Sequence, residues 1–299
     1  SPMSRGLGDV YKRQVVPGVS GGTIAFITGI YEELLASIKS ISPKALLILK
    51  EKGIKAAWEH INGTFLLILF LGIGTSIFSL AKIISHLLET YPILLWSFFF
   101  GLIIASVLFI GRQIKTWNVS AIISLLAGTA IAYYITIAAP ATAPESLWFV
   151  FLSGYIAICA MILPGISGSF ILLLLGSYAM VLNGVKDLNI LLIVVFLSGC
   201  VIGLLSFSHL LSWTFKHYRN ATLALLTGFM IGSLNKVWPW KEVLSYRTNS
   251  HGEQEVFLVK SILPTQYAEI AQQEPYVLAA IAAMIAGFFL VFLLSLIHI

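Results

Sequence analysis

Two clusters of proline, glycine and hydroxyl residues stand out in a chain that is otherwise mostly apolar. The first cluster is VPGVSGGT at residues 16–23, and the second cluster is LPGISGS at residues 163–169. Proline breaks helices, and a helix that begins after each cluster offers its free N–H groups and positive dipole end to an anion. Phosphate suits such a site best, because glycine lets the backbone approach it and serine or threonine adds hydroxyl donors.

The candidate phosphate-binding residues are therefore the glycine and hydroxyl residues of the two clusters. For one cluster alone, the alternative is that small residues merely allow close helix packing, as in many membrane bundles. Two copies, each with Pro-Gly, favour a binding site. We expect the two helix starts to hold one phosphate without a fixed cation, a metal or a cofactor. The residues are Gly18, Ser20, Gly21, Gly22, Thr23, Gly165, Ser167, Gly168 and Ser169.

The composition predicts an all-α membrane protein with several spans. Of the 299 residues, 58% are hydrophobic and 10% are charged, whereas soluble domains contain about 25% charged residues. The net charge of +5 lies in short loops between apolar runs, as orientation signals do, which argues against nucleic-acid binding. Cys159 and Cys200 both lie in apolar runs and are predicted to be packing residues rather than a disulfide or metal pair.

Helix breaks at membrane depth are tolerated only where protein or a water-filled cavity covers them, and transporters place substrate sites there. The apolar arms that flank the second cluster, residues 147–163 and 170–182, are each shorter than the roughly 20 residues of a span. We therefore predict a re-entrant helical hairpin. After the first cluster we predict a helix over residues 23–38, whose first part spans half the membrane and places Tyr31 at headgroup level.

The remaining elements follow from apolar length and polarity. Residues 39–60 are amphipathic and lysine-rich, which predicts a helix on the membrane surface. Residues 239–275 form a polar cap in which residues 243–247 and 255–259 flank NSHG like a β-hairpin, and Trp238 and Trp240 are read as membrane-interface anchors. Spans are predicted at residues 64–87, 92–110, 119–139, 190–215, 221–237 and 276–294.

The chain contains an internal repeat. Residues 16–41 align with residues 163–188, and a weaker alignment continues through the following two spans. Three spans lie between the first hairpin and the second, so we predict that the hairpins open toward opposite sides, as an inverted repeat does. Matched positions include Pro17/Pro164, Gly18/Gly165, Ser20/Ser167, Gly29/Gly176, Tyr31/Tyr178, Gly72/Gly199, Tyr91/Tyr218, Gly101/Gly228 and Ser106/Ser233.

The repeat sets the predicted organisation and sidedness. Residues 1–14 are read as a foreign N-terminal segment, residues 15–139 as the first half and residues 140–238 as the second half. Residues 239–275 form an extracytoplasmic loop subdomain, and residues 276–299 a final transmembrane helix. The basic loops fall on one side, which the positive-inside rule makes cytoplasmic.

Few titratable residues accompany the clusters. Glu32 and Glu33 follow the half-membrane arm that ends at Tyr31, near the membrane interface, and are either solvated helix-end charges or proton-exchange groups. His209 is either a packing residue or a proton relay. Arg112 and Arg219 close cytoplasmic span ends, where they set topology or receive a headgroup.

With the residues that follow them, the clusters read PGVSGGTIAFITGIYEEL and LPGISGSFILLLLGSY. They resemble a bacterial and archaeal membrane family once classed as a domain of unknown function and now assigned as undecaprenyl-phosphate (polyprenyl-phosphate) translocases. The resemblance covers about residues 16–294. Before the first cluster this chain departs from the family pattern, because an apolar helix with an acidic residue is expected where Gln14 stands.

The resemblance implies a lipid flippase in the cell membrane that returns undecaprenyl phosphate from the outer to the cytoplasmic leaflet for cell-envelope polymer synthesis. Its partners are then the polyprenyl phosphate and the membrane, and no enzyme activity is expected. From the residues alone, a carrier or channel for a small anion fits equally well. The G-x-S-G pattern in both clusters also fits an intramembrane serine protease, which needs His86 or His209 as its base. Oligomeric state and coupling ion are left open.

Overall fold

The computed structural model describes residues 21–296 except residues 142, 145 and 249–253. For residues 77, 78, 80–82, 246–248, 254–258 and 294–296 it describes the backbone path alone. The proposed foreign segment and the first cluster up to Ser20, including Gly18, lie outside the described residues. Gly21, Gly22 and Thr23 represent the first cluster below.

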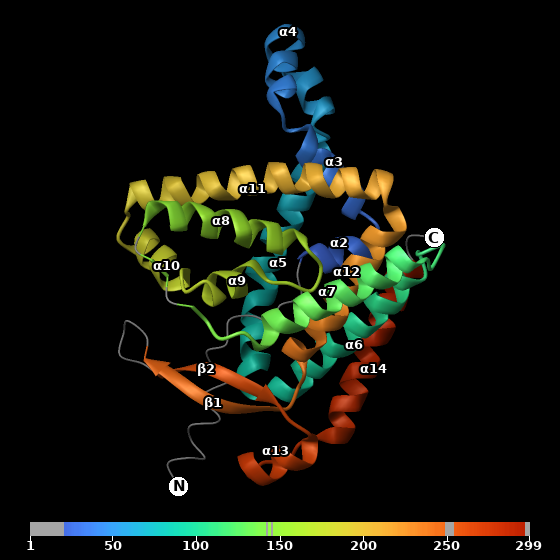
Figure 1. The fold of residues 1–299 in the computed structure, drawn as a ribbon, viewed down its shortest axis with the longest axis vertical. Helices are drawn as coiled ribbons and strands as arrows, with labels where there is room; N and C mark the ends of the chain where they lie inside the picture. Colours follow the sequence, from blue (N-terminus) through green and yellow to red (C-terminus); the bar gives the residue numbers. More distant parts are fainter. Residues whose placement is uncertain (1–20, 142, 145, 249–253, 297–299) are drawn as a thin grey trace.

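The described chain is helical apart from one β-hairpin (Figure 1). The helices are α2 (Gly21–Ile27), α3 (Tyr31–Ser40), α4 (Pro43–His60), α5 (Gly63–Thr90), α6 (Pro92–Gly111), α7 (Val119–Ile137), α8 (Leu147–Ile162), α9 (Gly168–Leu174), α10 (Tyr178–Lys186), α11 (Ile190–His217), α12 (Arg219–Val237), α13 (Pro264–Ala271) and α14 (Val277–Leu296); the strands are β1 (Lys241–Thr248) and β2 (Gln254–Ser261).

Several of these helices can cross a membrane. In the described part of the chain, α6, α7 and α11 are long and apolar enough to do so. Two bent pairs, α4 with the start of α5 and α9 with α10, raise the number to five if each pair forms one span. The chain is thus an all-α polytopic membrane protein, as its composition predicted.

Glycines set the distance between three pairs of packed helices. A Cβ atom added at Gly228 of α12 would lie 2.3 Å from the carbonyl oxygen of Leu125 in α7. Gly287 of α14 meets Phe98 of α6 in the same way, and Gly199 of α11 meets Phe151 of α8. Because lipid offers little hydrophobic driving force, such close backbone contact is how membrane helices associate.

Helix α12 lies at the centre of the bundle, packed against α7 and α6. Its Leu223, Ala224, Leu226 and Met230 are fully buried. The predicted span at residues 221–237 is therefore covered mostly by protein. It can carry polar residues along its length because neighbouring helices, rather than lipid, surround it.

The two predicted single helices that follow the clusters are each broken, so those predictions were wrong. Gly29 and Gly176 have φ of +71° and +72°, which glycine adopts without strain. At both breaks the same hydrogen bonds close the helix: Ile30 N–H to Ala25 O at 3.0 Å, and Ser177 N–H to Leu172 O at 3.0 Å. These are Schellman caps, in which the glycine ends the helix although the apolar pattern continues.

The breaks fall at matched positions of the repeat, and so do other features. Helices α5 and α11 each contain 28 residues. The residue before α6 is Tyr91 and the residue before α12 is Tyr218, both with φ of −135°. The two halves thus repeat one order of elements, with α4 inserted in the first; their opposite orientation in the membrane remains a prediction.

Tyr31 lies inside the protein rather than at headgroup level. It is 2% exposed, its ring lies 4.0 Å from that of Phe26, and its hydroxyl donates to the carbonyl oxygen of Ile162 at 3.2 Å. The break at Gly29 turns the chain, which directs the start of α3 toward the second half.

The polar cap contains the predicted β-hairpin, with Val243 opposite Val259 and Arg247 opposite Glu255. Trp240 is 3% exposed, and its Nε1–H donates to Pro275 O at 2.9 Å. Trp238 donates to Ile262 O at 2.8 Å. These indoles attach the cap to the bundle, so the interpretation of Trp240 as a membrane-interface anchor was wrong.

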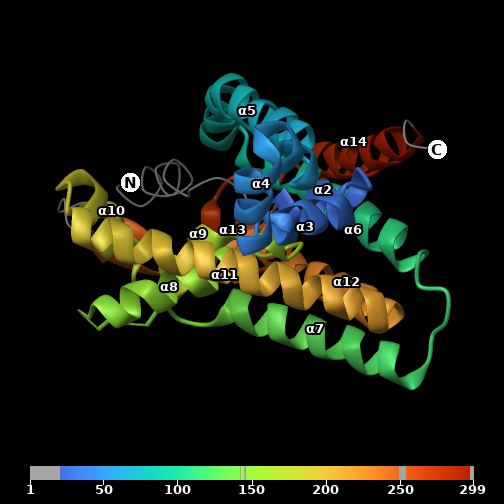
Figure 2. The same ribbon diagram turned by 90° about the horizontal axis from the view of Figure 1, so that it is seen from above.

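Helix α4 projects from one end of the bundle in Figure 1, and Figure 2 views the molecule from that end. None of the residues of α4 is buried. Leu46 and Ile54 are 69% and 78% exposed. An uncovered apolar face beside lysines suits a helix on a membrane surface, which stays a prediction.

Replacing Gly228 with alanine should destabilise the protein, because the added Cβ forces α12 away from α7. Overpacking of this kind costs about 1–3 kcal/mol, which thermal unfolding in detergent measures. The control is Gly72→Ala in α5, where a Cβ meets nothing within 4 Å. Equal stability of the two variants would show that the α7–α12 contact does not limit the fold.

Candidate functional site

The described part of the first cluster lies against the second cluster. Gly165 N–H donates to Thr23 Oγ1 at 3.0 Å, although the residues are 142 positions apart. A Cβ at Gly22 would lie 2.3 Å from Ile162 O, and Thr23 is fully buried. Figure 1 shows α2 beside the loop that joins α8 to α9. The fold therefore brings together two segments that the sequence singled out separately.

The second cluster turns the chain back on itself. Gly165 has φ of +85°, and a Cβ there would lie 2.7 Å from Ser233 Oγ of α12. A Cβ at Gly168 would lie 2.7 Å from Ala157 O, so α9 starts against α8. The Oγ atoms of Ser167 and Ser169 lie 2.9 Å apart and share a hydrogen bond. The loop thus presents two hydroxyls beside a tight glycine turn.

The helices that leave the clusters are short. Helices α2 and α9 contain 7 residues each, so few peptide dipoles add up along either one. The anion attraction expected from the helix starts alone is correspondingly reduced. Binding of a phosphate here must also use hydroxyls, loop amides and nearby cations.

A cation does lie next to the second cluster, and the sequence analysis missed it. Lys236 Nζ of α12 lies 3.9 Å from the centre of the Phe170 ring, directly after Ser169. The distribution of positive charge could have indicated this lysine. Lys236 lies at the end of α12 opposite Arg219, on the side of the membrane that is predicted to contain few positive charges. A lysine that breaks the positive-inside pattern has some other reason to be there.

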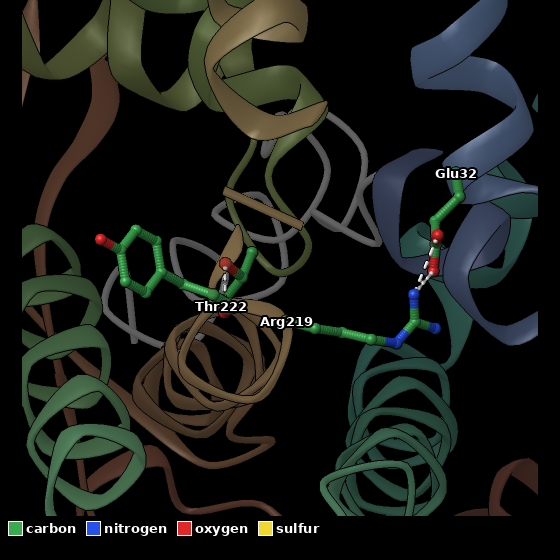
Figure 3. Close-up of polar contacts among 4 residues, drawn as sticks. Glu32, Arg219 and Thr222 are labelled. Atoms are coloured by element: carbon green, nitrogen blue, oxygen red, sulfur yellow. Dashed lines mark hydrogen bonds and ion pairs between the residues drawn. The ribbon is translucent and has the colours of Figure 1, made fainter. Parts of the chain in front are cut away.

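Two of the other candidates form an ion pair. Arg219 Nη1 lies 2.8 Å from Glu32 Oε1 and donates to Glu32 Oε2 at 3.0 Å (Figure 3). Arg219 begins α12, where the helix dipole disfavours a cation, and Glu32 lies in the first turn of α3, where it favours an anion. Both side chains are about half exposed, so solvent weakens the pair.

The remaining candidates lie apart from the clusters. Glu33 accepts from Asn62 Nδ2 at 2.8 Å and lines a cavity of about 150 Å³ with His60. His209 is exposed, and its Nδ1 is bonded to Leu205 O of its own helix at 2.8 Å. Arg112 caps the end of α6. Within the described chain, none of these three is hydrogen-bonded to a cluster residue.

The serine-protease alternative needs a histidine beside a cluster serine. Ser167 shares its hydrogen bond with Ser169, and His209 bonds its own helix. His86 is exposed on α5. In the segments that the structure describes, no serine–histidine pair is present at the second cluster, and no group of His, Cys, Asp and Glu could hold a metal.

Comparison with known proteins places the chain in a family. Residues 12–255 match the family model described as undecaprenyl phosphate translocase-like. The chain is 54% identical over 277 residues to a polyprenyl-phosphate transporter of Vibrio cholerae, which covers 93% of this chain and 90% of the relative. A polyprenyl-phosphate transporter of Staphylococcus aureus is 34% identical over 245 residues, covering 75% and 81%. No solved structure matches. The chain belongs to the undecaprenyl phosphate translocase-like family.

Proposed function

We propose that this protein moves polyprenyl phosphate from the outer to the cytoplasmic leaflet of a bacterial cell membrane, with the phosphate held between the two clusters. The observation that carries the proposal is the contact between Thr23 and Gly165. It joins the two segments of the chain that are best suited to bind an anion. The names of the relatives, which are polyprenyl-phosphate transporters, support the same substrate.

Among the described residues, polar groups of the clusters already have hydrogen-bond partners, one of them across the two clusters. The amide of Gly165 is bonded to Thr23, and the hydroxyls of Ser167 and Ser169 to each other. A phosphate oxygen that enters between them exchanges these neutral hydrogen bonds for charge-assisted ones, which are roughly twice as strong. The substrate therefore separates two surfaces that otherwise close on each other.

The Glu32–Arg219 pair lies at the predicted cytoplasmic end of α12. A phosphate that arrives there competes with the Glu32 carboxylate for the same guanidinium, whose planar geometry suits either group. Arg219 receives the headgroup, and Glu32 restores the pair when the lipid leaves. This arrangement makes binding at the exit reversible.

Moving the headgroup inward works against the membrane potential. Each negative charge costs about 2.3 kcal/mol per 100 mV against a negative interior, so a dianion costs about twice as much as a monoanion. The second pKa of a phosphate monoester is about 6. A proton taken up outside thus halves the electrical barrier, and we propose that a proton accompanies the lipid.

Thr23→Val should slow transport in proteoliposomes by about tenfold or more, because it removes one hydroxyl from a charge-assisted contact. Quenching of labelled polyprenyl phosphate in the two leaflets measures the rate. The control is Thr28→Val, since among the described residues Thr28 Oγ1 donates to carbonyl oxygens of its own segment, Ile24 O at 2.8 Å and Ala25 O at 3.3 Å. Equal rates in both variants would remove Thr23 from the substrate path.

The proposed coupling predicts faster inward transport when the outer compartment is acidic, because more headgroup is then a monoanion. Transport should also accelerate when the interior is made positive. Both effects are measured in proteoliposomes with imposed pH gradients and with potassium diffusion potentials. Transport rates that are unchanged by the pH gradient and by the potential would show that neither a proton nor the potential drives the step.

Arg219→Gln should slow transport while changing unfolding free energy by less than about 1 kcal/mol, because an exposed ion pair contributes little stability. Thermal unfolding and the flipping rate are compared for the same preparation. The control is Lys115→Gln, a neighbouring exposed cation whose backbone N–H bonds Asn220 Oδ1 at 3.3 Å. An unchanged transport rate in Arg219→Gln would show that Arg219 does not bind the headgroup and only sets the membrane topology.

A further inference from the structure

Two lysines lie together inside the protein at the end of α12, and we call Lys236 and Lys241 the lysine pair. Lys241 begins β1 yet is only 5% exposed. Its Nζ donates to the carbonyl oxygen of Lys236 and lies 4.6 Å from the centre of the Trp96 ring. Lys236 Nζ lies over Phe170, as described above. Each ammonium group thus faces an aromatic ring, and Lys241 is buried whereas Lys236 is partly exposed.

Within the described residues, neither lysine of the pair forms an ion pair with a carboxylate, although a buried cation needs a compensating negative charge. The ion pair between Arg219 and Glu32 lies at the opposite end of α12. Burial and the positive charge of Lys236 lower the pKa of Lys241 well below its ordinary value. Aromatic faces offset only part of the cost of burying a cation, and two neighbouring ammonium groups repel each other. An anion between them would remove both penalties.

The lysine pair is continuous with the second cluster through one face of α12. Ser233, one turn before Lys236, packs against Gly165, and Lys236 packs against Phe170, the residue after Ser169. Residues three apart on a helix share a face. The segment from Gly165 to Phe170, which includes the start of α9, therefore runs along α12 from the Ser233 hydroxyl to the Lys236 ammonium group.

We propose that the lysine pair is a binding site for the phosphate monoester headgroup, occupied before that headgroup reaches the two clusters. The inference rests on the proposed function for its ligand and adds the fixed cations that the clusters lack. By the predicted topology, this end of α12 faces outward, where the lipid is collected. A phosphate dianion neutralises both ammonium groups, whereas an uncharged polyprenol neutralises neither.

The test is binding of polyprenyl monophosphate to the full chain in nanodiscs, measured by native mass spectrometry, with Lys236→Met as the variant. We expect affinity to fall by at least about tenfold, because a charge-assisted contact is lost. The control is Lys260→Met on the same hairpin, an exposed lysine opposite Glu242, which should bind like the wild type. Binding of polyprenol should be equal in all three proteins. Wild-type affinity in Lys236→Met would overturn the proposal.

Stability without lipid distinguishes a site from a structural role. If the lysine pair is an anion site without its ligand, lipid-free Lys236→Met should unfold at the same or a higher temperature than the wild type, because a largely buried charge is removed. Lys236→Arg should retain most of the binding. A lower unfolding temperature together with lost binding in both variants would assign Lys236 to the fold and overturn the proposal.

Inorganic phosphate identifies the source of the ligand. If millimolar phosphate competes with the lipid in the wild type but not in Lys236→Met, the site binds the free anion as well as the lipid. If phosphate does not compete although lipid binding depends on Lys236, the site needs the lipid. Both results support the site. If the wild type flips no polyprenyl phosphate but binds it through Lys236, the proposed function fails and the site stands. If it flips the lipid and Lys236→Met binds normally, the site fails alone.

Discussion

Backbone groups that leave a helix inside an apolar environment must find partners, and in this protein the first half supplies them to the second. The amide of Gly165 is satisfied by the Thr23 hydroxyl, and the carbonyl oxygen of Ile162 accepts from Tyr31. A buried amide or carbonyl without a partner costs free energy comparable to a lost hydrogen bond. The interruption between α8 and α9 therefore depends on α2 and α3 being in place, which ties the two halves together at this point.

The same constraint explains why the bundle is arranged around α12. One face of this helix packs against α7 through Gly228, and another covers the loop of the second cluster through Ser233. Its ends carry Arg219 and Lys236, and Leu223, Ala224, Leu226 and Met230 between them are fully buried. On the proposed path, an anion meets the lysine pair first, then the hydroxyls and amides of the two clusters, and then Arg219.

This sequence of contacts suits a cargo that must be held and then released. Strong fixed charge at the centre would bind a phosphate tightly and slow its departure, whereas hydroxyls and amides bind it and let it go. The half-exposed Arg219 already has Glu32 as an alternative partner. At one end of α12, Arg219 is paired with Glu32. At the other end, Lys236 and Lys241 form no ion pair with a carboxylate among the described residues.

Much of the fold was readable from the sequence because it follows from local rules. Apolar length placed the long helices, and alternating residues around NSHG placed the hairpin, which the structure confirms. The repeat was visible in matched glycines and tyrosines. The breaks at Gly29 and Gly176 were missed because the apolar pattern runs through them. A cap with positive φ depends on the residue at which the helix ends, and the spacing of apolar residues does not specify that residue.

The sequence by itself determined the class of protein, the order of its long helices and the two clusters, since these depend on composition and nearest neighbours along the chain. Only the tertiary structure decided which groups meet. Thr23 reaches Gly165 across 142 residues, Arg219 finds Glu32, and Lys236 lies over Phe170, while His209 turns away to its own helix. Such contacts depend on how helices cross and on where glycine permits close approach, and spacing along the chain carries no record of either.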